Sequence, residues 1–490
     1  MSDFKMILAV KSRCLKGCFG SEGMAMRIFR EYDIRGIVEK DLLPEIVHRI
    51  GRAYATLARE RGVQTIAVGR DGRLTSPALR EQLISGLTQS GLNVIDLGLC
   101  ASPLLYFSLF HLPVDGGIMI TGSHNSAEYN GFKLCVGKEA LHGSDIQALR
   151  DLFEKGVFSV GEGTVEYRSI IPDYRAFLRE KFSHIPKNNG IHVVIDCGNG
   201  AASLVAKDVL EQLGCKVTGL YCELDGNFPH HHPDPTVMEN LEDLIHQVKE
   251  SGADIGIGYD GDADRIGVID DAGQVLWGDR LLLLFARDVL ADHPGGTFIS
   301  EVKASQVLYD DIHRRGGRGI MWKTGHSLIK AKMKEEKALL AGEMSGHLFF
   351  ADRYFGYDDA IYASCRLLEI LVKHRKPLSS LLKDVPQTIV TPEIRVDCPD
   401  DQKFRLVEAV SAKLKERFGQ PGVNAHPRIR DLILIDGVRV IFEDGWGLIR
   451  ASNTQPALVL RFEASSMSQL QTIRKFLEEQ LAAIQQQVMP

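Results

Sequence analysis

A short polar loop contains a serine at a position suited to a nucleophile. The loop at residues 121–125 (TGSHN) follows an apolar segment, residues 116–120, which predicts a buried strand. A serine at a strand end is exposed and held by a rigid scaffold, but free serine is a weak nucleophile that needs activation. His124 and Lys133 could supply positive charge nearby. The pattern favours phosphoryl transfer through Ser123, with an ordinary turn as the alternative.

Three alternating aspartates could supply the metal that such chemistry needs. The carboxylates of Asp260, Asp262 and Asp264 can converge on one point, where they repel each other unless a cation lies among them. Oxygen ligands favour Mg²⁺ or Ca²⁺. An EF-hand is excluded by the strand-like flanks and by Arg265 where that loop needs glycine. No helix follows the GxGxxG match at 256–261, so a dinucleotide site is also disfavoured. A magnesium site is predicted, with a solvated acidic turn as the alternative.

Further segments combine glycine with charged or hydroxyl side chains. Residues 32–36 and 69–73 place arginines beside glycines, where phosphate can approach the backbone, although surface salt bridges are the favoured interpretation of each one singly. Residues 342–347 present a carboxylate and a hydroxyl that could grip sugar hydroxyls. Residues 450–454 (RASNT) suit a stationary phosphate, with a capped turn as the alternative.

Together these motifs resemble the bacterial phosphomannomutase/phosphoglucomutase group of the α-D-phosphohexomutase superfamily. The motifs TGSHN with NGFK, DGDADR, GEMSGH and RASNT occur in the family's order, from about Ile28 to the C-terminal helix. The resemblance implies that Ser123 is the phosphoryl carrier and a Mg²⁺ ligand together with Asp260, Asp262 and Asp264. It also implies catalytic roles for Lys133, Arg265, His347, His326, Arg35 and His124, and substrate binding by Tyr32, Lys303, Glu343, Ser345, Arg450, Ser452, Asn453 and Thr454.

The serine loop departs from the family at one point. Ser126-Ala127 replaces the proline-containing sequence that the family often has after His-Asn. Because proline fixes φ, its loss should loosen the turn, but it removes no group that does chemistry.

The activity implied by the resemblance is the reversible interconversion of hexose 1-phosphate and hexose 6-phosphate, for mannose and glucose. A phosphoserine enzyme would act through a hexose 1,6-bisphosphate, and glucose 1,6-bisphosphate or mannose 1,6-bisphosphate would be the activator. The general base is left open among His347, Lys133 and His326. The alternatives are a phosphoglucosamine mutase, in which glutamine typically replaces Met344, and a non-catalytic sugar-phosphate-binding protein. A phosphatase is disfavoured, because domain closure would keep water from phospho-Ser123.

Composition indicates a globular enzyme of several domains. The chain has 490 residues and a net charge of −6, which argues against nucleic acid as a partner. Nine scattered cysteines indicate a reducing compartment, and no apolar run is long enough to span a membrane. We expect a cytoplasmic monomer whose partners are small sugar phosphates, without nucleic-acid or membrane binding.

The elements that must position these motifs follow a recurring unit. A strand, a glycine-rich loop and a helical pattern recur at 65–84, 192–210, 297–312 and 319–334, which predicts mixed or parallel sheets covered by helices. The resemblance implies three related α/β domains and a smaller α+β domain around a central active-site cleft. We expect an N-terminal extension at 1–26, with the natural start at Met24 or Met26, and domains at 27–171, 172–273, 274–386 and 387–490.

Overall fold

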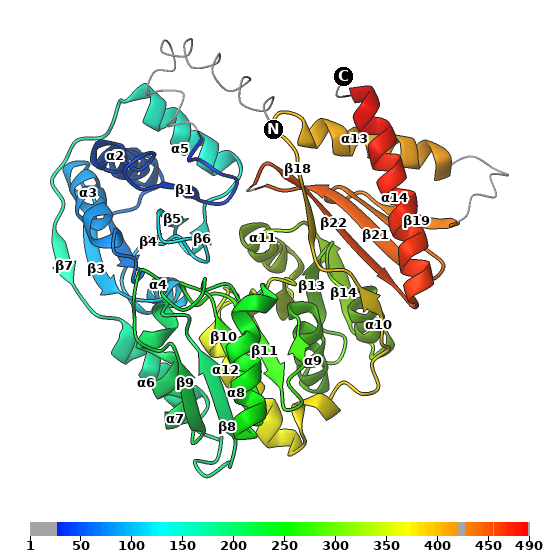
Figure 1. Cartoon of the computed structure of the whole chain (residues 1–490). Coiled ribbons are helices and arrows are strands. Elements are labelled where there is room, and N and C mark those ends of the chain that lie inside the picture. The colour runs from blue at the N-terminus through cyan, green and yellow to red at the C-terminus, as the bar shows by residue number, and fades with distance from the viewer. Residues whose placement is uncertain (1–26, 419–426, 454, 489–490) are drawn as a thin grey trace, which may run out of the picture.

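The computed structural model describes residues 27–418, 427–453 and 455–488, so the expected N-terminal extension lies outside the described residues. Four sheets are arranged in an arc, with the first unit (blue to cyan) and the C-terminal unit (orange to red) at its two ends (Figure 1). Among the described residues, no helix is long and apolar enough to cross a bilayer.

The first three sheets contain the same four-strand arrangement. In each, three parallel strands stand in the order second, first, third, and a fourth strand runs antiparallel beside the third. In chain order these strands are β2 (Thr65–Arg70), β3 (Asn93–Leu99), β4 (Gly116–Ile120) and β5 (Tyr129–Val136); β8 (His192–Asp196), β9 (Lys216–Leu220), β10 (Ile255–Tyr259) and β11 (Ile266–Asp270); and β13 (Thr297–Glu301), β14 (Arg318–Trp322), β15 (Leu340–Gly342) and β16 (Leu348–Phe350).

Additional strands extend two of these sheets. They are β1 (Ile34–Ile37), β6 (Glu139–Ala140) and β7 (Val165–Tyr167) in the first sheet, and β12 (Val275–Leu276) in the second. The central parallel strands are buried along their length, as in β4 (GGIMI) and β8 (HVVID), which explains why their sequences are continuous apolar runs.

Helices cover the first three sheets. They are α2 (Pro44–Glu60), α3 (Ser76–Gln89), α4 (Ser102–His111), α5 (Ser144–Lys155), α6 (Ile171–Lys181), α7 (Ala206–Gln212), α8 (Glu242–Ser251), α9 (Gly278–Asp292), α10 (Gln306–Arg314), α11 (His326–Glu336) and α12 (Ala360–His374). Proline in the first turn of α2, α3, α4 and α6 favours a helix start, because its fixed φ is helical and its missing N–H is not needed there.

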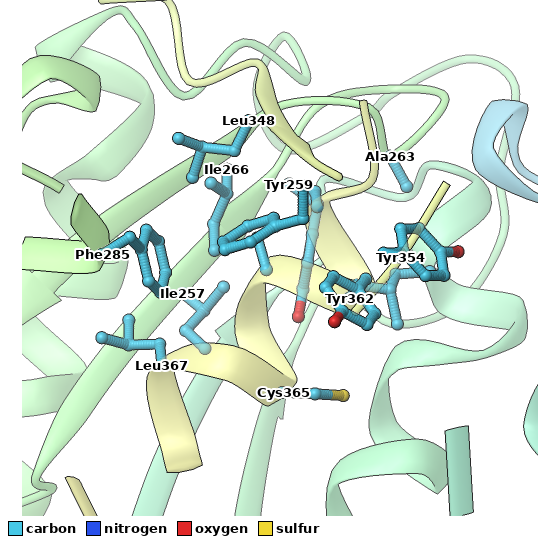
Figure 2. Packing of buried hydrophobic residues seen from close by; sticks show 14 of the residues in the cluster. Ile257, Tyr259, Ala263, Ile266, Phe285, Leu348, Tyr354, Tyr362, Cys365 and Leu367 are labelled. Atoms are coloured by element: carbon cyan, nitrogen blue, oxygen red, sulfur yellow. The ribbon is translucent and has the colours of Figure 1, made fainter. Parts of the chain in front are cut away.

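The second and third units share a hydrophobic core. Figure 2 shows Tyr362 and Cys365 of α12 beside Ile257 and Tyr259 of β10, and the Tyr259 hydroxyl lies 2.8 Å from Ser364 Oγ. Burying aromatic and aliphatic side chains of both units against one another stabilises them as one body.

The C-terminal unit is a different, antiparallel structure. Its six strands are β17 (Ile389–Val390), β18 (Ile394–Asp397), β19 (Ile429–Ile433), β20 (Val438–Phe442), β21 (Gly445–Ala451) and β22 (Ala457–Ala464), and α13 (Lys403–Phe418) and α14 (Met467–Val488) pack on the sheet. Buried Arg439 joins this unit to the third by donating to the carbonyls of Val302 and Ala304, both at 2.7 Å, while it stacks on Trp446.

Candidate active site

The loop between the third and fourth strands of each repeated unit carries one of the predicted motifs. These loops are residues 121–128 after β4, 260–265 after β10 and 343–347 after β15. Loops at the carboxyl ends of parallel strands are where α/β sheets bind ligands. The repeat therefore brings the serine loop (121–128), the acidic loop (260–265) and the predicted sugar-binding loop (343–347) to equivalent edges of three neighbouring sheets.

Ser123 directly contacts the acidic loop. Its Oγ donates to Asp260 Oδ2 at 3.0 Å and lies 3.1 Å from His124 Nδ1. Its φ of 49° lies in the left-handed region, which non-glycine residues seldom adopt, and its N–H donates to Thr121 Oγ1 at 2.8 Å. Burial and neighbouring positive charges, first those of Arg265 and Arg35, hold the pKa of His124 well below its usual value, so its ring is neutral.

Arg73 fixes the backbone of the serine loop. Its guanidinium is buried and donates to the carbonyls of Ser123 (2.7 Å), Asn125 (2.5 Å), Ser126 (2.6 Å) and Tyr129 (3.0 Å). These bonds hold the turn that lacks the family's proline.

Arg73 therefore fits neither interpretation of segment 69–73. Its side chain is only 1% exposed, it pairs with Asp71 at 3.2 Å, and the Phe228 ring lies 5.1 Å from the guanidinium carbon. The residue is thus neither a surface ion pair nor an open phosphate ligand. In contrast, Arg35 of β1 lies beside the serine loop, donating to Asn125 Oδ1 at 2.6 Å and to Asp33 at 2.7 Å.

The three predicted metal ligands form one buried cluster. Asp260, Asp262 and Asp264 each offer an oxygen within 4.8 Å of the others, and all three are fully buried. The Oδ1 atoms of Asp262 and Asp264 have no hydrogen-bond partner among the described residues. Burial and the other two carboxylates raise the pKa of Asp260 well above its usual value. These carboxylates repel one another, and two of their oxygens have no hydrogen-bond partner among the described residues. A hard divalent cation bound among them would satisfy both conditions.

Lys133 partly neutralises this cluster. Its Nζ lies 2.6 Å from Asp262 Oδ2 and also contacts Asp264 Oδ2. Burial lowers the pKa of Lys133, but the two carboxylates outweigh that effect and the net pKa is raised, so the side chain is a cation. Ser102, the first residue of α4, donates its backbone N–H to the carbonyl of Asp262 at 2.9 Å and holds the acidic loop from the first unit.

Arg265 and His347 link the acidic loop to the sugar-binding loop. Arg265 Nε donates to His347 Nε2 at 2.9 Å, and the two residues also form an antiparallel bridge. His347 Nδ1 lies 3.0 Å from Asp358 Oδ2, while Lys330 donates to the other oxygen of that carboxylate at 3.1 Å.

Three neighbouring rings, His347, His326 and Tyr32, lead from the acidic loop toward the C-terminal unit. The His326 and His347 rings stack with centroids 5.7 Å apart, and the Tyr32 ring lies 5.8 Å from His326. Burial and then the charge of Lys330 hold the pKa of His326 well below its usual value. The Tyr32 hydroxyl donates to the Thr324 carbonyl at 2.9 Å and accepts from Asn453 Nδ2 at 2.5 Å. These contacts join the two ends of the arc seen in Figure 1.

The sugar-binding loop and the predicted phosphate loop lie beyond Tyr32. Glu343 accepts the Gly325 N–H at 2.8 Å, and Ser345 is half-buried in the same turn. Lys303 pairs with Glu393 at 3.1 Å. Arg450 pairs with Asp436 at 3.0 Å.

The rest of the phosphate loop follows Arg450. Ser452 Oγ accepts the Gln455 N–H at 3.1 Å, while Thr454 lies outside the described residues. Asp436 Oδ2 also accepts the Thr324 N–H at 3.0 Å, so it connects the phosphate loop to the third unit.

Four buried or partly buried residues of this region were not predicted from the sequence. They are Ser102, Glu301, Asp358 and Asp436. Glu301 ends β13 and accepts from Thr324 Oγ1 at 2.6 Å and from Met344 N–H at 2.9 Å, so it orders the sugar-binding loop. In sequence, Ser102 before proline resembles a helix start, and Asp358 precedes Asp359, which is the N-cap of α12. Both residues therefore look in sequence like parts of a helix start, and not like parts of a functional site.

Four family models match the chain in order. They describe phosphoglucomutase/phosphomannomutase alpha/beta/alpha domain I at residues 26–159, domain II at 172–273, domain III at 277–389 and the C-terminal domain at 393–480. Together with the four sheets, these matches confirm the predicted four-domain architecture of related α/β units and a smaller C-terminal unit.

Known relatives agree with these models. The phosphomannomutase/phosphoglucomutase of Pseudomonas aeruginosa PAO1 is 48% identical over 457 residues, covering 93% of this chain and 96% of that protein. The phosphoglucomutase of Neisseria gonorrhoeae is 45% identical over 450 residues, covering 91% and 95%. A crystal structure of a phosphoglucomutase/phosphomannomutase family protein from Burkholderia thailandensis matches with a TM-score of 0.85 and 39% identity, covering 94% of this chain and 98% of that one. The chain belongs to the phosphoglucomutase/phosphomannomutase family of the α-D-phosphohexomutase superfamily.

Proposed function

We propose that this protein interconverts the 1-phosphates and 6-phosphates of mannose and glucose, with Ser123 as the phosphoryl carrier. The observation that carries the proposal is the contact of Ser123 Oγ with Asp260, a member of a buried cluster of three carboxylates, at 3.0 Å. A nucleophile beside an oxygen-only cation site is the pairing that metal-assisted phosphoryl transfer requires.

The relay has two transfers and one carrier. Phospho-Ser123 gives its phosphoryl group to O6 of a hexose 1-phosphate, and the resulting 1,6-bisphosphate turns end over end within the site. Ser123 then takes the phosphoryl group from O1. Mg²⁺ held by the three aspartates and the phosphoserine would stabilise the negative charge that develops on the transferring group. A hexose 1,6-bisphosphate added as activator would phosphorylate Ser123 and so prime the enzyme.

Positive charge on both sides of Ser123 favours the transfer. Lys133 contacts two of the acidic ligands, and Arg35 holds Asn125 of the serine loop. Because Lys133 is held protonated, it serves as a charge and not as the general base in this state. The remaining candidates for the base are His326 and His347. Their Nδ1 atoms lie 4.0 Å and 3.0 Å from Asp358 Oδ2.

The stationary phosphate is proposed to bind at Arg450, Ser452, Asn453 and Thr454. Arg450 is already paired with Asp436, so an incoming phosphate would compete with, or add to, that carboxylate. Glu343 and Ser345 would grip hydroxyls that are shared by both orientations of the sugar. One fixed phosphate site then serves both transfers.

The proposal predicts a specific order of substrates. With Mg²⁺ and a catalytic amount of glucose 1,6-bisphosphate, glucose 1-phosphate and mannose 1-phosphate should be converted at comparable rates, and glucosamine 1-phosphate at least about tenfold more slowly. A coupled assay run on the three in parallel measures this. Preference for the amino sugar would favour the phosphoglucosamine mutase. Turnover of none by folded, phosphorylated protein would favour the binding protein.

A second prediction concerns Arg73. Arg73→Lys should lower kcat by about 10- to 100-fold with a smaller change in KM, because one ammonium group cannot reach four carbonyls and the nucleophile loses its orientation. Steady-state kinetics on folded protein measure it. Arg70→Lys is the matched control, since Arg70 donates to the carbonyl of Asp71 at 3.3 Å, outside the serine loop. Equal kinetics for the two variants would contradict this role.

A further inference from the structure

Two thiols lie in contact behind the acidic loop. Cys197 directly follows β8, and Cys222 follows the neighbouring parallel strand β9 by two residues. Their sulfur atoms are 3.3 Å apart, and the Cys197 N–H donates to the carbonyl of Leu220 at 3.1 Å. Adjacent strands are about 4.8 Å apart, within the range of backbone spacings that a disulfide bridges.

The two thiols differ in a way that suits stepwise oxidation. Cys197 is fully buried, whereas Cys222 is partly accessible to solvent. The hydrogen bond between the thiols lowers the pKa of Cys222, and the same bond together with burial raises that of Cys197. An accessible thiol with a lowered pKa next to a second thiol is the arrangement of a redox-sensitive pair.

A metal site does not account for this pair. Within the described parts of the chain, the two groups of three side chains able to hold an ion contain aspartate and histidine and no cysteine. His231 Nε2 lies 3.0 Å from Asp196, the last residue of β8, and so is paired with that carboxylate. The reactive group in contact with each of the two sulfurs is therefore the other sulfur.

We propose that Cys197 and Cys222 form a reversible disulfide when the protein meets a hydroperoxide such as hydrogen peroxide. The Cys222 thiolate attacks one peroxide oxygen, the O–O bond breaks, and the departing hydroxide takes a proton to become water, leaving a sulfenic acid. The Cys197 sulfur then attacks the Cys222 sulfur, the S–O bond breaks, and the Cys197 proton leaves with the hydroxide as a second water. Two thiols and one peroxide thus give one disulfide and two waters.

The disulfide is placed to affect the acidic loop. The loop that Cys197 begins packs against Gly261: the Ala201 N–H donates to the Gly261 carbonyl at 2.9 Å, and a Cβ on Gly200 would meet that carbonyl at 2.8 Å. Bond formation shortens the sulfur separation of 3.3 Å to about 2.05 Å and pulls on this loop. If the proposed mutase function holds, oxidation therefore lowers turnover by displacing Asp260 and its neighbours.

The test treats the folded full-length protein with hydrogen peroxide, blocks the remaining thiols, and maps linked peptides by mass spectrometry without reduction. We expect a Cys197–Cys222 peptide that dithiothreitol removes. Cys222→Ser and Cys222→Ala should abolish it, whereas Cys215→Ser, a buried cysteine of the same unit that contacts Asn189, should leave it unchanged. Oxidation of other cysteines while Cys197 and Cys222 stay unlinked would overturn the proposal.

Activity is the second readout and separates the two proposals. Peroxide should lower wild-type turnover by about tenfold or more, dithiothreitol should restore it, and both Cys222 variants should resist. Linkage without a change in turnover would overturn the regulatory part. Because peptide mapping does not depend on catalysis, the disulfide can be demonstrated even if no sugar phosphate is converted.

Discussion

Ser123→Ala should abolish phosphosugar turnover, with a loss of about four to six orders of magnitude in kcat. The substitution removes the oxygen that contacts Asp260 at 3.0 Å and would carry the phosphoryl group. Other groups of the site cannot substitute for it, because the neighbouring carboxylates are committed to the cation site and Lys133. Coupled kinetics with glucose 1-phosphate measure the loss, and intact mass before and after incubation with the bisphosphate shows whether a phosphoryl group is still taken up.

Ser126→Ala is the matched control for that experiment. It makes the same chemical change three residues along the same loop, where the contact with Arg73 is made by the backbone carbonyl and survives the substitution. Ser126→Ala should keep near-normal kcat and should be phosphorylated. Near-normal turnover by the folded Ser123→Ala variant would contradict the phosphoserine mechanism.

The repeated unit explains why much of the site could be predicted from the sequence. The strand predicted at 116–120 is β4, and the strand-like flanks of the acidic loop are β10 and β11. Local patterning predicts such strands because buried parallel strands are continuous apolar runs. Once the strands are known, the loops that follow them are candidate ligand sites, and motif chemistry indicates what each binds.

What sequence could not supply is the identity of long-range partners. Arg73 lies 50 residues before Ser123 and Asp358 lies 11 after His347, and neither separation indicates contact. An arginine that binds carbonyls looks the same in sequence as one that binds phosphate, since both positions require a fixed fork of donors. Likewise, the approach of Tyr32 to Asn453, 421 residues later, depends on how the four units close on one another. Such facts follow from tertiary packing.

The acidic cluster should show opposite effects of one substitution on activity and on stability. Chelation with EDTA should abolish turnover and added Mg²⁺ should restore it, since the cation offsets charge in the transition state. Asp260→Asn should lower kcat by about 10³-fold or more. In EDTA, however, the same variant should unfold at a higher temperature than wild type, because burial and two neighbouring carboxylates already disfavour the charge on Asp260.

The side-chain geometry makes this gain specific to one position. An asparagine at 260 keeps an oxygen that can accept the backbone N–H groups of Asp264 (3.0 Å) and Arg265 (3.1 Å). Asp262→Asn is the matched comparison: it should lose activity equally but gain no stability, because Asp262 pairs with Lys133 at 2.6 Å. Thermal unfolding with EDTA and with Mg²⁺ measures both variants. If Asp260→Asn kept the stabilisation that Mg²⁺ gives wild type, the three aspartates would not be the metal site.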